Sequence, residues 1–146
     1  MITKDNIIIR KDLTSVYRIA SDIKNQHTFI PGYLPSKILK WDNNEFIVER
    51  TAKMGKKILK WKSKGKLVKN KFIEFIQLEG RLKGMKIKWL FEELSNNTTK
   101  VTIIHNFKIP YPVIGLIAGV FIAKPTINKI TRNVLIGLKN KVENLQ

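Results

Sequence analysis

The side chain best suited to chemistry in this sequence is His105. It follows Val101 and Ile103 and precedes Phe107 at steps of two, so these side chains share one face of an extended strand. An inward histidine could hydrogen-bond a carbonyl or hydroxyl group of a ligand, or act as a general acid or base. It could equally be a core histidine whose ring nitrogens are satisfied by neighbouring protein groups. The pattern leaves both interpretations open.

Other kinds of chemistry lack the residues that they need. The sequence has no cysteine, which excludes thiol catalysis, disulfides and cysteine-ligated metal sites. The second histidine, His27, precedes the Pro31-Gly32 turn and is expected to be exposed, far from His105 in the sequence and without a carboxylate-rich helix nearby. No Ser-His-Asp pattern, P-loop or GxGxxG motif occurs. We therefore expect no metal site, no cofactor and, apart from the candidate His105, no catalytic residue.

Lysine gives the chain a strongly positive charge, because 28 Lys and Arg residues against 11 Asp and Glu leave a net charge of +17. Nine lysines lie in residues 53–71, and period-two alternation predicts an outward face that carries Lys60, Lys62, Lys64 and Lys66. Such a surface attracts anionic partners, so peripheral contact with an anionic membrane or the ribosome is one interpretation. The other is compositional, since an AT-rich genome encodes many lysines and lysines protect sheet edges. Sequence-selective base reading is poorly supported, because the aromatic residues alternate inward and arginine is scarce.

These candidate residues must be positioned by a sheet and by one long helix. From about Val113 to Gln146, apolar residues recur at steps of three or four and form one stripe: Leu116, Val120, Ala123, Ile127, Ile130, Val134, Leu138, Val142 and Leu145. Residues 113–123 are apolar on nearly every side, which predicts burial or contact with something other than water. Pro125 removes one backbone hydrogen bond and predicts a kink near residues 119–124. We expect this bend and the loop at residues 27–34 to form the mouth of a cavity.

Upstream of this helix, the pattern predicts one strand, two short helices and six further strands. The strand Thr3–Arg10 is followed by helices at about Leu13–Asp22 and Lys24–Phe29. Turn residues then separate six runs whose hairpin-length connections imply antiparallel pairing: Leu34–Trp41, Glu45–Lys53, Lys57–Val68, Phe72–Glu79, Met85–Leu94 and Thr98–Lys108. Alternation leaves the inward face of the run Glu45–Lys53 ambiguous. No linker divides the chain, so we expect a single domain over residues 1–146, of the α+β class.

This order of elements resembles the helix-grip fold of the START-like, or SRPBCC, superfamily, and local segments agree. Residues 27–32 (HTFIPG) are similar to an aromatic-x-Pro segment in the polyketide cyclase/dehydrase and coenzyme-Q-binding branches. Residues 79–91 and 101–110 are similar to a Trp-x-Phe segment and the last strand of those branches. The resemblance implies a curved antiparallel sheet of about seven strands around a long C-terminal helix, with two short helices after strand 1. It also implies a hydrophobic ligand, such as a lipid, isoprenoid quinone or polyketide-like compound, held between sheet and helix.

The cavity that this resemblance implies would be lined by inward strand residues and by the first part of the helix. Small residues at Ser63, Gly65 and Ala118 would leave room, and His105 or Gln77 would orient one polar group of the ligand. The candidate ligand-binding residues are Trp61, Ser63, Phe75, Gln77, Trp89, Phe91, His105, Phe107, Ile114, Ile117, Ala118 and Phe121. Two alternatives remain: a polyketide cyclase or dehydratase that uses His105, and a ribosome- or RNA-associated basic protein.

The ends of the chain and its apolar runs predict a cytoplasmic protein. The N-terminal segment MITKDNIIIRKD has charge on both sides of its apolar core and does not resemble a signal peptide. The longest charge-free run, residues 109–123, has 15 residues. A membrane-spanning helix needs roughly 20.

Overall fold

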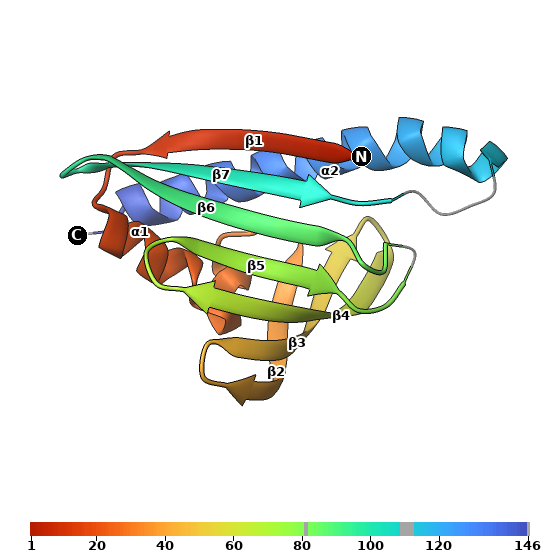
Figure 1. Cartoon of the computed structure of the whole chain (residues 1–146), viewed down its shortest axis with the longest axis horizontal. Helices are drawn as coiled ribbons and strands as arrows, with labels where there is room; N and C mark the ends of the chain where they lie inside the picture. Colours follow the sequence, from red (N-terminus) through yellow and green to blue (C-terminus); the bar gives the residue numbers. More distant parts are fainter. Residues whose placement is uncertain (81, 109–112, 146) are drawn as a thin grey trace.

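Seven antiparallel strands form one curved sheet, and the long C-terminal helix lies along its inner side (Figure 1). This computed structural model describes residues 1–80, 82–108 and 113–145; the side chains of residues 54 and 113–123 lie outside the description. The elements are β1 (Ile2–Ile9), α1 (Leu13–Ala20), the 3-10 helix η1 (Ile23–Thr28), β2 (Tyr33–Asp42), β3 (Glu45–Met54), β4 (Lys57–Val68), β5 (Phe72–Gln77), β6 (Lys86–Ser95), β7 (Thr98–Asn106) and α2 (Val113–Glu143). The α+β helix-grip architecture predicted from the sequence is therefore confirmed.

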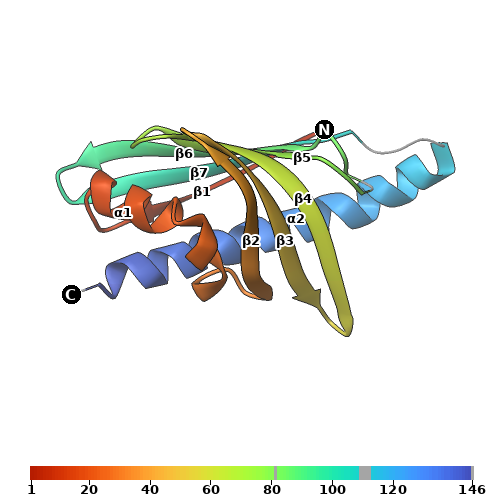
Figure 2. The same cartoon turned by 90° about the horizontal axis from the view of Figure 1, so that it is seen from below.

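The strands follow the order β1-β7-β6-β5-β4-β3-β2, so β2 to β7 form a meander and β1 pairs with β7. The predicted turn residues Asn43 and Asn70 have φ values of 56° and 60°, a left-handed conformation that asparagine tolerates better than most residues. Figure 2 shows that β2, β3 and β4 turn away from the direction of the other strands and that the β3–β4 hairpin projects past α2. This curvature lets one sheet cover the helix from two sides.

Two short helical segments connect β1 to the meander. Asp12 begins α1 as its N-cap: its carboxylate accepts a hydrogen bond of 3.0 Å from the Ser15 backbone N–H, which lowers the pKa of Asp12. The helix ends at Ala20, two residues before the predicted end. The second helix, predicted at Lys24–Phe29, is a 3-10 helix. Gln26 is buried in it and donates a 2.8 Å hydrogen bond to the Ala20 carbonyl oxygen, so the two segments are held together.

The C-terminal part of α2 is packed solidly against α1 and the sheet. Leu135, Leu138 and Val142 are fully buried and belong to one core cluster with Val16 and Tyr17 of α1. Leu138 and Val142 belong to the stripe that the sequence predicts, and Leu135, three residues before Leu138, widens the buried face beyond it. We call this region the packed half of the molecule.

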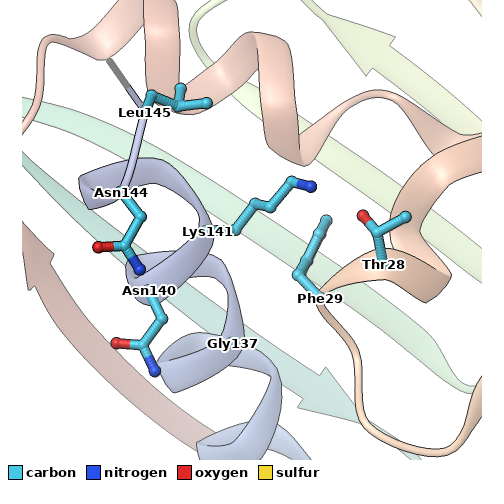
Figure 3. Close-up of a pocket in the computed structure, with 7 residues that line it drawn as sticks. All are labelled: Thr28, Phe29, Gly137, Asn140, Lys141, Asn144 and Leu145. Atoms are coloured by element: carbon cyan, nitrogen blue, oxygen red, sulfur yellow. The ribbon is translucent and has the colours of Figure 1, made fainter.

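The loop after η1 touches α2 directly at Gly137. A Cβ atom at this position would lie 1.9 Å from the Phe29 carbonyl oxygen, so only glycine allows this approach. Figure 3 shows Thr28 and Phe29 facing the last turns of α2, across a small surface pocket of about 420 Å³. Because the contact is to backbone, which cannot rotate away, Gly137 joins the helix rigidly to the loop.

The first part of α2 is a continuous helix that includes Pro125. The missing N–H of this proline therefore does not end the helix. The kink predicted near residues 119–124 falls largely in the part of the helix whose side chains the structure does not describe, so it stays a prediction. Among the described residues, no helix is long and apolar enough to cross a membrane.

Candidate functional site

A cavity of about 900 Å³ lies between the inner face of the sheet and the middle of α2. Most of its lining is apolar and comes from β3 to β7, from residues 30–33 at the start of β2, and from residues 126–134 of α2. Its exposed lining residues include Lys53, Gly55, Lys60 and Lys129, which mark the open side. Small-molecule sites in proteins measure roughly 300–1,000 Å³, so this cavity has the size of a ligand-binding pocket.

Strand register brings the inward side chains together. Directly opposite residues of antiparallel strands point to the same face. Arg50 is paired with Trp61 and Ser63 with Gln77, while Phe75 is paired with Ile87 and Ile87 with His105. The alternation seen in the sequence thus produces a continuous inner surface across five strands.

Half of the predicted ligand-binding residues line this cavity, namely Trp61, Ser63, Phe75, Gln77, Trp89 and His105. Four others, Ile114, Ile117, Ala118 and Phe121, have side chains outside the described part of the chain. Apolar lining residues that the sequence analysis did not select include Tyr33, Ile87, Ile103, Ile127, Ile130 and Val134. Of these, Ile127, Ile130 and Val134 belong to the predicted helix stripe, so the sequence did contain a signal that could have identified them as lining residues.

Phe91 and Phe107 were predicted as lining residues but do not line the cavity. The Phe91 ring packs edge-on against Tyr17 of α1, with ring centroids 5.0 Å apart. Phe107 is buried in a small cluster with Met85 and Ile127. Both side chains point inward as predicted, but other elements cover them.

Gly65 was expected to leave room for a ligand, and this expectation is wrong. The Phe46 ring occupies the space, since a Cβ on Gly65 would lie 2.0 Å from the ring. These two residues are opposite each other in the β3–β4 ladder. Glycine here allows an aromatic side chain to lie flat on the neighbouring strand, and Ser63 remains the small residue that faces the cavity.

Arg50 is the functional candidate that the sequence analysis missed. Its side chain lines the cavity and is only 4% exposed, and its Nη1 has no hydrogen-bond partner. The guanidinium carbon lies 5.0 Å from the ring centroids of both Tyr33 and Phe75. Burial lowers the pKa of Arg50, and the neighbouring Tyr33 opposes that shift. The signal was present, because Arg50 alternates with Phe46, Val48 and Ala52, all of them buried.

His105 lines the cavity and is 8% exposed. Burial lowers its pKa from 6.5 to about 4, so the imidazole is neutral at pH 7. The Thr131 hydroxyl donates to the Ile127 carbonyl oxygen at 2.8 Å and lies 3.4 Å from His105 Nδ1. A hydroxyl has one hydrogen to donate, so His105 Nδ1 must carry the proton in this contact. That tautomer leaves the Nε2 lone pair as a hydrogen-bond acceptor or base.

Gln77 lies at the cavity edge, where its amide is already engaged. Its Nε2 donates a 2.9 Å hydrogen bond to the Glu79 carbonyl oxygen in the β5–β6 connection. This assignment leaves the amide oxygen as the group that can face a ligand. Among the described residues, no cluster of three or more His, Cys, Asp or Glu side chains could hold a metal ion.

The predicted lysine face is present on the outer side of β4. Lys60, Lys64 and Lys66 are exposed, and Lys62 is half-buried. The β3–β4 hairpin also exposes Ile58 by 62% and Leu59 by 43%. The sequence predicted Leu59 to point inward, and it does line the cavity, but the hairpin projects so far that this side chain also reaches solvent.

Solved structures with the same fold include aromatase/cyclases. The Zhui aromatase/cyclase from Streptomyces sp. R1128 is 14% identical and superposes with a TM-score of 0.89, covering 98% of this chain and 93% of that one. A START superfamily protein from Mycobacterium smegmatis is 12% identical, with a TM-score of 0.78 and 99% of both chains covered. The di-domain ARO/CYC BexL of the BE-7585A biosynthetic pathway is 20% identical with a TM-score of 0.84, covering 98% of this chain and 46% of that one. At these identities the likeness shows the fold.

Comparison of the sequence with curated proteins finds no match. The family model described as polyketide cyclase/dehydrase and lipid transport matches residues 9–131. This match extends from the end of β1 to the middle of α2 and includes every described residue that lines the cavity except Asn133 and Val134. The chain therefore belongs to the polyketide cyclase/dehydrase and lipid transport family.

Proposed function

We propose that the protein binds and carries a hydrophobic small molecule, such as a lipid, an isoprenoid quinone or a polyketide-like compound, in the cavity between the sheet and α2. The observation that carries the proposal is the cavity of about 900 Å³ with its mainly apolar lining. Burial of apolar ligand surface contributes about 25 cal/mol per Å², so aromatic and aliphatic walls alone can hold such a molecule.

Native mass spectrometry of the protein purified from its source tests this proposal. We expect a bound species of a few hundred daltons that organic extraction removes, since a ligand of that size fits a pocket in this volume range. The extracted protein should then bind the uncharged fluorescent probe N-phenyl-1-naphthylamine. Protein that carries no extractable ligand and binds no apolar probe would contradict carriage.

A cyclase- or dehydratase-type enzyme is the second candidate, because a neutral histidine lines the same cavity. His105 Nε2 could remove a proton from a bound polyketide-like substrate if Nδ1 carries the proton. Family membership is compatible with either function. His105→Ala should abolish turnover while probe binding persists if this candidate is right, and turnover that survives the substitution would exclude His105 as the base.

The β3–β4 hairpin is proposed as a contact with an anionic membrane surface. Exposed Ile58 and Leu59 lie among Lys53, Lys56, Lys57 and Lys60, and Leu59 also lines the cavity. Apolar side chains surrounded by lysines suit the boundary between lipid headgroups and acyl chains. Ribosome contact through the same lysines would not need these two apolar side chains, so the membrane is the better-supported partner.

Sedimentation with vesicles distinguishes these partners. We expect binding to vesicles that contain phosphatidylglycerol and loss of that binding in the Ile58→Ser/Leu59→Ser double variant. Co-sedimentation with ribosomes that the double variant retains, without vesicle binding by either protein, would favour the ribosome.

A further inference from the structure

Arg50 is a buried cation without an anionic partner among the described residues. Arginine side chains that are mostly withdrawn from water normally pair with a carboxylate, because an isolated buried charge is unfavourable. Those that find no such partner normally extend their charged end to solvent. Arg50 does neither: it is 4% exposed and takes part in none of the ion pairs of the described residues. Its Nη1 is left without a hydrogen bond.

The cavity around Arg50 has lysines at its open side and no carboxylates in its described lining. None of the described lining residues is Asp or Glu, and none of the residues outside the description is acidic in the sequence. Lys53, Lys60 and Lys129 are lining residues that are exposed to solvent. The electrostatic field inside it is therefore positive and favours an anionic group.

Two aromatic rings hold the guanidinium in place. The rings of Tyr33 and Phe75 lie within 5.0 Å of its central carbon, close enough for favourable cation–π contact. Contacts through ring faces leave N–H groups at the edge of the guanidinium available, and that edge matches the two oxygens of a carboxylate. The side chain is thus ordered before any ligand arrives.

We propose that the ligand is an amphipathic organic acid whose carboxylate pairs with Arg50 while its hydrophobic body fills the rest of the cavity. This inference rests on the proposed function and narrows the ligand to anions. The hydrophobic body of this acid is either aromatic or aliphatic. One pair of probes for each type distinguishes these two classes of ligand.

Matched probes test the charge preference directly. The aromatic pair is 8-anilino-1-naphthalenesulfonate and N-phenyl-1-naphthylamine, which share one skeleton and differ in a sulfonate that stands in for the carboxylate. The aliphatic pair is oleate and oleyl alcohol, each measured by displacement of N-phenyl-1-naphthylamine. Titrations at about 0.15 M salt screen the exposed lysines and leave buried charge largely unscreened. We expect the wild-type protein to bind the anion of at least one pair about tenfold or more tightly than its neutral partner, as a charge-assisted bidentate pair implies.

Variants assign the preference to Arg50. Arg50→Gln should remove the preference, taken as the ratio of the anion's affinity to that of its neutral partner in the same variant, so that a general change in cavity affinity cancels. Arg50→Lys should retain part of the preference, because it keeps the charge without the planar fork. Lys64→Gln removes one cation from the outer face of β4 and should change neither the preference nor the affinity for N-phenyl-1-naphthylamine. Thermal unfolding shows whether each variant is folded, and the comparison of probes on the wild-type protein needs no variant.

The outcomes separate this inference from the function on which it rests. Neutral probes that bind as well as the anions, or an anion preference that survives Arg50→Gln, would overturn the inference and leave hydrophobic carriage intact. A preference reduced equally by Lys64→Gln would also overturn it, because overall charge would then be the cause. Failure of all four probes to bind would overturn both.

Discussion

The two halves of the space between the sheet and α2 are built differently. In the packed half, Leu135, Leu138 and Val142 are fully buried against α1 and the sheet, and Gly137 brings the helix onto the loop backbone. The other region, which we call the hollow half, contains the cavity of about 900 Å³ and lies between β3 to β7 and residues 126–134 of α2. The same helix therefore supplies a filled core at one end and the candidate binding site at the other.

This difference indicates that the cavity is not a packing defect. Arg50, His105 and Thr131 are buried polar side chains, and all three line the hollow half. Buried polar groups reduce stability unless they are paired, so Arg50, whose Nη1 has no hydrogen-bond partner, supports the proposed binding function. In the packed half, the buried residues Leu135, Leu138 and Val142 of α2 are all aliphatic.

The largest expected effect compares a truncation in each half. Leu138→Ala should lower the free energy of unfolding by about 2–5 kcal/mol, because it opens a void in a filled core. Ile130→Ala, which truncates a partly buried side chain at the cavity wall, should cost about 1–2 kcal/mol. Urea denaturation measures both values. Equal losses would mean that the hollow half is packed in solution as tightly as the other.

The next effect concerns pH, because the hollow half holds a buried histidine. The pKa of His105 is about 4 in the folded protein against 6.5 for an unperturbed histidine, so the unfolded chain binds more protons between these values. The contribution of His105 to the free energy of unfolding should therefore be constant above about pH 7 and fall by about 2 kcal/mol between pH 7 and pH 5.

The matched control for this pH dependence is His105→Gln. This variant should reduce the slope of the unfolding free energy between pH 7 and pH 5, whereas Leu138→Ala should lower the whole curve without changing its slope. The pKa of Glu143 is also lowered, chiefly by the hydrogen bond from the Arg10 backbone N–H. Its stabilising contribution is lost at more acidic pH, through its depressed pKa, so it does not account for the fall above pH 5. An unchanged slope in His105→Gln would show that another group titrates.

The last pair of variants enlarges a small residue in each half. Gly137→Ala should cost about 1–3 kcal/mol, because the new methyl group meets the Phe29 carbonyl oxygen. Ser63→Val places its larger side chain in the cavity, so it should lower the free energy of unfolding by less than about 1 kcal/mol. It should also weaken binding of N-phenyl-1-naphthylamine. Thermal unfolding and probe titration of both variants test this. Normal binding by Ser63→Val would mean that the probe occupies another site.

Much of the fold was predictable because alternation and helical spacing are local signals. The strand runs, the turn residues Asn43 and Asn70, and the stripe on α2 all follow from residue types a few positions apart. The faces of Trp61 and His105 were predictable for the same reason.

What the sequence could not supply is which inward residues are covered by other elements. Phe91 and Trp89 alternate on one face, yet α1 covers Phe91 and leaves Trp89 at the cavity. Filling of the space at Gly65 depends on Phe46, which lies on another strand. Arg50 was missed because alternation left the inward face of residues 45–53 ambiguous, and a charged residue is rarely expected among buried ones.

The glycine contact at residue 137 also bears on how the proposed ligand would reach the interior. Helix and loop backbone lie against each other there without room for a side chain, so we expect the motions that admit a ligand at the opposite end of α2. We therefore expect loading and release to use the same doorway, between the residue 30–33 segment and the turn of α2 after Pro125.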